Sequence, residues 1–342
     1  MKTAHSLWFE GPCRVGFRET PVPAPEAGEI QIQALCSAVS HGTELLVYRG
    51  QVAPDLPLDV GLTTMEGSFR FPVKYGYASV GEVREVGPAV TGVRPGDRVF
   101  VHHPHQSGYV VAASRAVKLP SGLLPAHGVF LASLETAYNA LLDSRLHLGE
   151  TIAIFGQGVV GLLLTQLARK AGADLIIAVD GFEGRRALAS QLGADVVLAP
   201  TEDVPQLIRG HTDGRGADVV VEASGAPAAL ASAIRAVADQ ATVVVVSWYG
   251  TKPVTLPLGE EFHRGRLMLK SSQVSRLDPS LQPRWTLNRR LQTVLRWLPL
   301  LALDPLISHR YPFAEAGRAY AQIDQHPKEV VQVVFEYDGD RG

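Results

Sequence analysis

The chain of 342 residues is long enough for two domains of ordinary size. Its 46% hydrophobic and 19% charged residues are typical of a soluble globular protein, and a net charge of -2 with scattered basic residues argues against a nucleic-acid partner. Two distant cysteines exclude a disulfide framework, and the absence of a long apolar run excludes a signal-peptide core or membrane span, so we expect a cytoplasmic protein with no membrane partner.

Residues 1–119 are predicted to form a β-rich domain. Proline and glycine clusters divide this region into short alternating runs, which predict strands at Ile30–Ala34, Ala78–Val86, Arg98–Val101 and Tyr109–Ala112. An extended, edge-like segment is expected where prolines recur, at Pro21, Pro23 and Pro25, because proline lacks the N–H that a central strand needs.

From Ala126 to Leu146 the apolar period becomes helical, and strands and helices then alternate through Val274. Alternating segments of this length predict a doubly wound parallel sheet and therefore an α/β fold. A helix is expected at Leu287–Leu301 and a last strand at Val330–Tyr337. The arginines in and just before that helix are interpreted as a solvated helix face; they are Arg284, Arg289, Arg290 and Arg296.

The most informative stretch runs from Thr151 to Asp180. An apolar strand leads into a G-x-G-x-x-G spacing and then an apolar helix; the residues of this turn are Gly156, Gly158, Val159, Val160 and Gly161. The first glycine permits a tight turn, the second lets the backbone approach a pyrophosphate, and the third lets helix and strand pack closely. The helix N-terminus offers N–H groups to phosphates. The stretch therefore predicts dinucleotide binding, the alternative being a βαβ turn without a ligand.

Asp180 ends the second strand of this stretch and bears on the choice of cofactor. Its carboxylate can accept hydrogen bonds from an adenosine ribose and repels a 2′-phosphate, which favours NAD. Arg185 and Arg186 follow closely and suit a 2′-phosphate, so NADP stays an alternative. Residues that follow later strand ends, where such folds bind ligands, are also predicted to contact the cofactor; they are Ser224, Gly225 and Ser247.

Several motifs spread along nearly the full length are typical of one family. They are TGVRPGDRV, the GQGVVG turn, Asp180 with Arg185 and LASQLGAD after it, GADVVVEASG, ALDPLISH and the AYAQID helix. With these motifs the chain resembles the medium-chain dehydrogenase/reductase superfamily. The resemblance implies a GroES-like β-rich domain at 1–130, completed by 276–342, a Rossmann domain at 131–275, and a site in the cleft between them. It also implies hydride transfer with NAD(H) or NADP(H), usually in a homodimer or homotetramer, and a basic residue at Arg185 commonly accompanies NAD use.

Three further stretches, SAVSHGTELLVYRG, HHPHQSGYVV and SWYG…FHRGRLMLKSSQ, look like a zinc-independent branch that includes relatives of bacteriochlorophyllide dehydrogenases. Where zinc members place their ligands, this sequence has Ser40 or His41, then Tyr77 and Ala78, then Ala132. A tyrosine and two alanines cannot build a tetrahedral site of nitrogen and sulfur ligands. Three histidines lie close together in the following loop: His102, His103 and His105. They are interpreted as polar surface or cleft residues, and no metal ion is expected.

Without zinc, the charge that develops on the substrate oxygen must be stabilised by hydrogen-bond donors. The resemblance implies that the candidates for this catalytic role are Ser40, His41, Thr43 and Tyr77. It also implies that Thr136 contacts the nicotinamide. The alternatives are structural, since Thr43 and Glu44 could cap the following helix and Tyr77 could fill the core.

We therefore predict a zinc-independent, NAD-preferring oxidoreductase that acts on an alcohol/carbonyl pair of a small-molecule substrate. The alternatives are reduction of an activated C=C bond, as in quinone and enoyl reductases, and a catalytically silent NAD(P)H-binding protein. Four aromatic residues indicate a bulky or aromatic substrate, unless they serve core and interface packing; they are Trp248, Tyr249, Phe262 and Trp285.

Overall fold

The computed structural model describes residues 2–58, 67–201 and 203–337. Its contacts divide the chain into two compact units: the first comprises Met1–Ala132 with Ile307–Gly342, and the second comprises Ser133–Leu306. The division departs most from the expected boundaries at residues 276–306, which are expected in the first domain but belong to the second unit. The physical reason is that a buried arginine of helix α8 (Leu287–Trp297) pairs with a glutamate of helix α3 (Leu131–Ser144).

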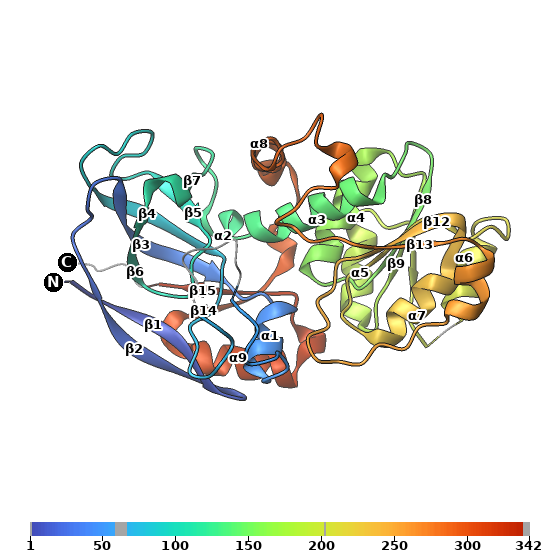
Figure 1. The fold of residues 1–342 in the computed structure, drawn as a ribbon, viewed down its shortest axis with the longest axis horizontal. Coiled ribbons are helices and arrows are strands. Elements are labelled where there is room, and N and C mark those ends of the chain that lie inside the picture. The colour runs from blue at the N-terminus through green and yellow to red at the C-terminus, as the bar shows by residue number, and fades with distance from the viewer. Residues whose placement is uncertain (1, 59–66, 202, 338–342) are drawn as a thin grey trace. The chain divides into compact units, whose positions relative to one another are not determined.

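The first unit contains a two-stranded hairpin and a seven-stranded sheet (Figure 1). The hairpin pairs β1 (Lys2–Gly11) with β2 (Arg14–Val22). The larger sheet has the order β14-β15-β3-β4-β5-β7, with β6 beside β3. Its strands are β3 (Glu29–Ala38), β4 (Ser79–Val86), β5 (Arg98–Val101), β6 (Gly108–Ala112), β7 (Val117–Lys118), β14 (Ile307–Pro312) and β15 (Gln332–Glu336). The four strands predicted in the N-terminal region and the last predicted strand are confirmed.

The C-terminal segment completes the sheet of the first unit. Strand β15 runs antiparallel to β3, and β14 runs parallel to β15. Helix α9 (Ala316–Gln325) lies between these two strands in the chain and buries residues at the spacing of one helix face: Ala316, Ala319, Tyr320 and Ile323. The ring of Tyr320 lies 5.3 Å from that of Phe9 and 6.1 Å from that of Phe335, so the aromatic core of this unit unites both ends of the chain.

The second unit is built on a six-stranded parallel sheet (Figure 1). Its strands are β8 (Thr151–Phe155), β9 (Leu175–Val179), β10 (Val196–Leu198), β11 (Ala217–Glu222), β12 (Val237–Val245) and β13 (Met268–Ser271). The order is β10-β9-β8-β11-β12-β13, and each pair of neighbours is parallel. The chain therefore winds outward from β8 in both directions, which confirms the predicted doubly wound α/β sheet.

Helices α3 to α8 accompany this sheet; besides α3 and α8 they are α4 (Val159–Ala171), α5 (Glu183–Gln191), α6 (Val204–Gly210) and α7 (Pro227–Ala236). All five residues of β8 are buried, as expected for a parallel strand covered on both faces. Helix α4 ends where the sequence predicts, because Gly172 adopts a left-handed conformation with φ of 91° and closes the helix. The first unit adds the short helices α1 (Thr43–Tyr48), α2 (Pro125–Gly128) and the α9 described above.

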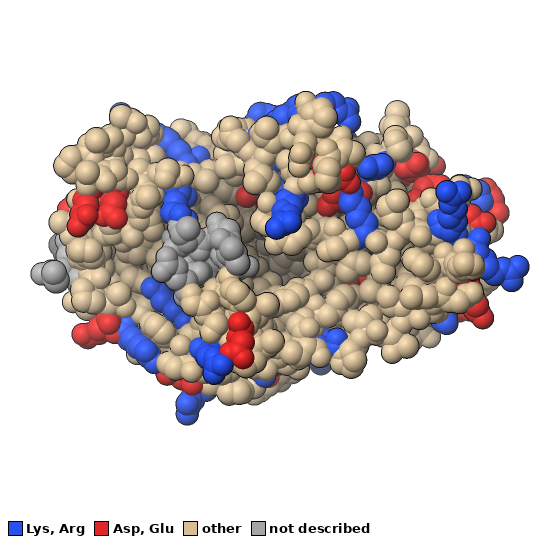
Figure 2. Space-filling view, in the orientation of Figure 1, with Lys and Arg blue, Asp and Glu red and all other residues tan. Residues whose placement is uncertain are grey.

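The described part of the chain holds no helix with the length and apolar character needed to cross a bilayer. Figure 2 shows acidic and basic side chains interspersed over the face in view, as the scattered charges of the sequence predict.

Candidate functional site

The glycine turn, residues 156–161, is shaped by close approaches between backbone segments. Gly156 has a φ of 95°, which L side chains rarely adopt, and a Cβ atom there would lie 2.6 Å from Ser224. A Cβ atom on Gly161 would lie 1.9 Å from the carbonyl oxygen of Gly156, so the helix can start this close to β8 only with glycine at this position. A Cβ atom on Gly158 would meet nothing within 4 Å, which leaves open space beside the turn.

The N-terminus of α4 faces this open space. Residues 151–157 and 161–168 are buried, whereas Gly158, Val159 and Val160 are half-exposed. No side chain caps the helix at Gly158. The first N–H groups of a 13-residue helix therefore remain available to an anion, and the helix dipole adds to their attraction. The turn fits a dinucleotide pyrophosphate.

Asp180 holds the glycine turn in place. One of its carboxylate oxygens accepts the backbone N–H of Gln157 at 2.7 Å, and the other accepts that of Phe182 at 2.8 Å. Each oxygen keeps further acceptor capacity, so a ribose hydroxyl can still bind. Arg185 stacks over Phe182 at 4.9 Å, and burial lowers its pKa while Asp180 opposes that shift. Arg186 donates to the carbonyl oxygen of Asp180 at 2.9 Å, so both arginines lie beside the predicted ribose ligand.

Glu222, which the sequence reasoning did not single out, brings the three predicted strand-end residues together. Its Oε1 accepts the N–H of Ser224 at 2.7 Å and that of Gly225 at 3.1 Å. The Gly225 N–H also donates to Ser247 Oγ at 2.8 Å. The other oxygen of the fully buried Glu222 carboxylate accepts the Tyr249 hydroxyl at 2.6 Å. The motif GADVVVEASG contains this glutamate, and its position at a strand end was the available signal.

In the first unit, three of the predicted catalytic residues form what we call the hydroxyl cluster: Ser40, Thr43 and Tyr77. The Tyr77 hydroxyl donates to Ser40 Oγ at 2.5 Å and lies 3.4 Å from Thr43 Oγ1. All three residues are half-buried, and His41 lies between Ser40 and Gly42 in the same turn. Tyr77 also packs against the core of the unit, as the core-filling alternative predicts.

A buried carboxylate supports the hydroxyl cluster. Glu44 is fully buried, and its Oε1 accepts the backbone N–H of Ser40 at 2.8 Å. Its Oε2 lies 2.9 Å from His105 Nε2 and also accepts the Tyr320 hydroxyl. Helix α1 begins after Gly42 without a side-chain cap, so Thr43 does not cap it and Glu44 instead reaches back to the preceding turn.

Two of the loop histidines, His103 and His105, are buried, so the surface alternative is wrong for them. His105 is fully buried between Glu44 and Ser37, with its Nδ1 2.7 Å from Ser37 Oγ. His103 is 7% exposed and stacks on Tyr109, and burial lowers its pKa to about 3. His102 is half-buried, with Nδ1 3.1 Å from the carbonyl oxygen of Tyr77. The residue type alone did not show that two imidazoles replace apolar side chains in this core.

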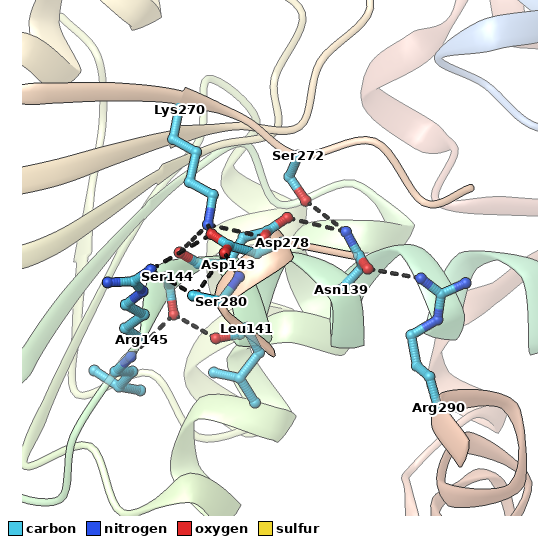
Figure 3. A network of polar contacts seen from close by, with 11 residues as sticks. Asn139, Leu141, Asp143, Ser144, Arg145, Lys270, Ser272, Asp278, Ser280 and Arg290 are labelled. Atoms are coloured by element: carbon cyan, nitrogen blue, oxygen red, sulfur yellow. Dashed lines mark hydrogen bonds and ion pairs between the residues drawn. The ribbon is translucent and has the colours of Figure 1, made fainter. Parts of the chain in front are cut away.

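Thr136, the predicted nicotinamide contact, is half-buried in α3. The residue before it, Glu135, belongs to a buried ion pair. Glu135 Oε1 lies 3.2 Å from Arg290 Nη2. Figure 3 shows the next contact of this arginine, in which its Nη1 donates to Asn139 Oδ1, at 2.6 Å. Burial raises the pKa of Glu135, and Arg290 opposes this shift. Arg290 is 4% exposed, so the interpretation of the arginine helix as a solvated face is wrong for this residue, whereas Arg284, Arg289 and Arg296 are exposed.

The same network extends along α3 away from Thr136. Asn139 donates to Asp143 at 3.0 Å and to Ser272 at 3.1 Å. Lys270 of β13 lies 3.0 Å from Asp143 Oδ1 and 2.5 Å from Asp278 Oδ2, as Figure 3 shows. Helix α3, the edge strand β13 and the 276–306 segment are thereby joined within the second unit.

The four aromatic residues considered for a substrate pocket have different surroundings. Tyr249 is bound to Glu222, and Trp285 lies under the Arg289 guanidinium at 4.4 Å. Phe262 packs at the margin of the second unit's core, and Trp248 is 38% exposed. Contacts within the second unit therefore account for Tyr249, Phe262 and Trp285, and Trp248 is the exposed member of the four.

The hydroxyl cluster lacks the ligand types that a zinc ion requires. Structural and catalytic zinc ions take thiolate, imidazole or carboxylate ligands, whereas the hydroxyl cluster offers neutral hydroxyl groups. Within the described residues, no three His, Cys, Asp or Glu side chains are grouped so as to hold a metal ion. The hydroxyl cluster does not fit a tetrahedral zinc ion.

Two family models match this chain. The model for an alcohol dehydrogenase GroES-like domain matches residues 26–123, and the model for a zinc-binding dehydrogenase matches residues 159–287. The matches agree with the division into a β-rich unit and a doubly wound unit. The expected combination of a GroES-like domain with a Rossmann domain is confirmed.

Curated relatives and solved structures match nearly the full length. A D-guloside 3-dehydrogenase of Escherichia coli (strain K12) is 29% identical over 327 residues, covering 90% of this chain and 92% of that protein. An L-threonine 3-dehydrogenase of Pyrococcus horikoshii is 29% identical over 325 residues, covering 86% of this chain and 87% of that protein. The solved structure of 2R,3R-butanediol dehydrogenase from Bacillus subtilis superimposes with a TM-score of 0.80 at 22% identity, covering 97% of this chain and 99% of that one.

Proposed function

Because the chain belongs to the medium-chain dehydrogenase/reductase superfamily, we propose that it transfers a hydride between NAD(H) and an alcohol/carbonyl pair without a catalytic zinc ion. The observation that carries the proposal is the hydroxyl cluster, in which the Tyr77 hydroxyl donates to Ser40 Oγ and lies 3.4 Å from Thr43 Oγ1. The family resemblance implies that zinc members use these segments for metal ligands and proton relay. The names of the two curated relatives, both dehydrogenases of hydroxyl-bearing compounds, support an alcohol/carbonyl substrate.

The second unit supplies the dinucleotide site of this proposal. The open turn at Gly158 and the N–H groups of Val159 and Val160 bind the pyrophosphate. Asp180 accepts a ribose hydroxyl with its remaining lone pairs, and its charge disfavours a 2′-phosphate. When bound, the nicotinamide supplies or accepts the hydride.

The remaining predicted cofactor residues hold the other end of the dinucleotide. Glu222 keeps Ser224 and Gly225 in a fixed loop beside Ser247, so their polar groups are preorganised for the ligand. Thr136 is assigned to the nicotinamide. Arg185 and Arg186 lie beside Asp180, and they provide the charge that NADP would need if it were bound instead.

The hydroxyl cluster supplies the proton. In carbonyl reduction, the Tyr77 O–H donates to the oxygen on which negative charge develops, and the proton passes to that oxygen. Without substrate the Tyr77 O–H donates to Ser40 Oγ, so it turns from Ser40 to the substrate oxygen for this step. The hydroxyl of Ser40 or Thr43, both of which lie within reach of the Tyr77 oxygen, then donates its proton to that oxygen and takes one from solvent. Glu44 fixes the Ser40 backbone during these steps. The reverse sequence serves alcohol oxidation.

The first test of this role is Tyr77→Phe, which removes the proton and keeps the ring. We expect kcat to fall by about a hundredfold or more, because general acid catalysis contributes about 10²–10⁴-fold, while NADH affinity is unchanged. Tyr311→Phe in β14 is the matched control and retains wild-type kcat. A Tyr77→Phe enzyme with wild-type kcat would contradict the proton role.

Metal analysis and nicotinamide titrations test the other parts of the proposal. We expect metal-free protein that binds NADH more tightly than NADPH. Near-stoichiometric zinc would overturn zinc independence, and tighter NADPH binding would mean that Arg185 and Arg186 outweigh Asp180. Turnover of quinones or enones but not ketones would favour the C=C reductase alternative, and binding without turnover would favour a catalytically silent protein.

A further inference from the structure

The first unit has a surface cavity, open to solvent and of about 440 Å³, that the proposed function does not use. Its walls come from the end of β2, the following Pro-rich segment, the loop before β4 and the loop around β6. The polar lining residues used below are Glu26, Glu29, Lys74, His103, Gln106 and Tyr109. This volume lies within the range of about 300–1,000 Å³ found for small-molecule sites.

Lys74 is the cationic side chain of this cavity. Its ammonium group donates to Gln106 Oε1, a neutral acceptor. Among the residues that the structure describes, no carboxylate forms an ion pair with it at 4.0 Å or less. Burial lowers the pKa of Lys74 to about 8, because desolvation disfavours the charged amine. Two of the three N–H donors of the ammonium group are left for a ligand.

The other lining groups are engaged with the protein. Gln106 Nε2 donates to the carbonyl oxygen of Gly108 at 2.6 Å, and the Tyr109 hydroxyl lies 2.9 Å from Ser79 Oγ. The His103 ring stacks on Tyr109 at 3.7 Å, and its Nδ1 lies 2.8 Å from the carbonyl oxygen of Pro104. Burial lowers the pKa of His103 to about 3, so this ring is neutral near pH 7 and does not compete for an anion. The stacked rings form a flat apolar wall beside the ammonium group.

The acidic groups of the lining limit the ligand further. Glu29 accepts the backbone N–H of Glu26 at 2.9 Å, so both glutamates belong to one turn of the cavity wall. Two carboxylates in the same lining as one ammonium group disfavour a ligand with high negative charge. They favour a ligand that presents a hydrogen-bond donor to them and a single negative charge to Lys74.

We propose that this cavity is a binding site for a small carboxylate that also carries a hydroxyl or ammonium group, with the carboxylate paired to Lys74. The ligand carboxylate takes the N–H donors that Gln106 leaves, and the ligand's own donor faces Glu26 or Glu29. Such a charge-assisted pair replaces the hydration that burial removes from the ammonium group. The site serves an effector or accessory ligand and does not depend on the proposed function.

The direct test is competitive acetylation of the seven lysines of the protein, followed by mass spectrometry, with lactate as the probe ligand. Saturating lactate should slow acetylation of Lys74 about tenfold, because only the ligand-free fraction reacts, and leave the exposed Lys118 unchanged. Chloride at matched ionic strength should have no effect. Acetylation of Lys74 that is insensitive to lactate, or slowed equally by chloride, would overturn the proposal. No nicotinamide is added, so the result is independent of hydride transfer.

Thermal shift measurements give a second readout. Lactate should raise the Tm of the wild type and of Lys118→Met, but not that of Lys74→Met. The shift should be larger at pH 7 than at pH 9, because the ammonium group loses its proton as pH rises through its pKa of about 8. A lactate shift that persists in Lys74→Met would place the ligand elsewhere and overturn the assignment. If Lys74→Met does not fold, the effect of lactate on Lys74 acetylation in the wild type alone tests the proposal.

Discussion

Glu44 in the first unit and Glu135 in the second are both buried carboxylates beside residues of the candidate site, yet they are held by different means. Glu44 accepts hydrogen bonds from the Ser40 backbone N–H and the Tyr320 hydroxyl and lies 2.9 Å from the His105 ring. Glu135 is paired with the guanidinium group of Arg290. The first carboxylate is held by hydrogen-bonding groups of several residues, and the second is held by a group of interactions that includes one opposite charge.

The difference shows what each carboxylate fixes. Glu44 and Ser40 are four residues apart, so their hydrogen bond fixes the conformation of one turn. Glu135 and Arg290 are 155 residues apart, so their ion pair fixes a distant helix against α3. A charge held by several dipoles tolerates the loss of one of them, whereas a charge held by one counterion does not. The second unit should therefore be the more sensitive to a single substitution.

The largest effect is expected for Arg290→Met, which leaves the buried Glu135 without its counterion. We expect the free energy of unfolding to fall by about 3–5 kcal/mol, measured by urea denaturation. Burial already raises the pKa of Glu135, and it rises further without Arg290. The folded variant then binds a proton more tightly than the unfolded chain, so the loss is greatest at neutral pH and shrinks as pH falls toward the ordinary glutamate pKa of about 4.3.

The double variant Glu135→Leu/Arg290→Met is the control for this charge effect. Replacing both partners by apolar groups should recover most of the stability lost by Arg290→Met alone, because no buried charge remains. If the double variant is as unstable as the single one, Arg290 contributes packing and not charge compensation.

A smaller effect is expected for Glu44→Gln, which keeps the side-chain volume and one acceptor oxygen. We expect the free energy of unfolding to fall by about 1–3 kcal/mol, because one of the buried donors around the former carboxylate loses its acceptor. Glu82→Gln removes a surface pair with Arg84 and should change stability by less than about 1 kcal/mol. If Glu44→Gln costs more than Arg290→Met, the contrast between the two carboxylates is reversed.

The smallest effect on stability is expected for Gly158→Ala, which tests whether the second unit's site depends on backbone as well as on side chains. Gly158 has a φ of -73° and an open surrounding, so alanine should change the free energy of unfolding by less than about 1 kcal/mol. NADH affinity should nevertheless fall at least about tenfold, because the new methyl group occupies the space assigned to the pyrophosphate. Gly210→Ala, also in open space, is the control, and equal NADH affinity in both variants would contradict the assignment.

The sequence predicted those features that depend on neighbouring residues. The turn at Gly156 and its neighbouring helix follow from glycine spacing and apolar periodicity, and the parallel sheet follows from the alternation of strands and helices. The place of Asp180 at a strand end predicts a role as a ligand of the ribose, whereas its hydrogen bond with the Gln157 N–H does not follow from the sequence. Local rules were sufficient for the architecture and for the position of the dinucleotide turn.

Contacts between distant residues could not be predicted in this way. Nothing in the sequence around Arg290 distinguishes it from the exposed arginines of the same helix, because its partner is 155 residues away. The same limitation explains why residues 276–306 were assigned to the wrong unit, since an amphipathic helix does not show which surface covers its apolar face. The burial of His105 likewise depends on Glu44 and Ser37, which are far from it in sequence.

The pairing of β15 with β3 has a consequence for the order in which the protein can be made. The second unit is one continuous segment, Ser133–Leu306, and all of its strands precede β14 in the chain. The first unit begins earlier but cannot complete its sheet until β14 and β15 have also emerged from the ribosome. A released chain truncated after residue 306 should therefore hold a folded second unit and an open first unit, with the edge of β3 accessible to chaperones.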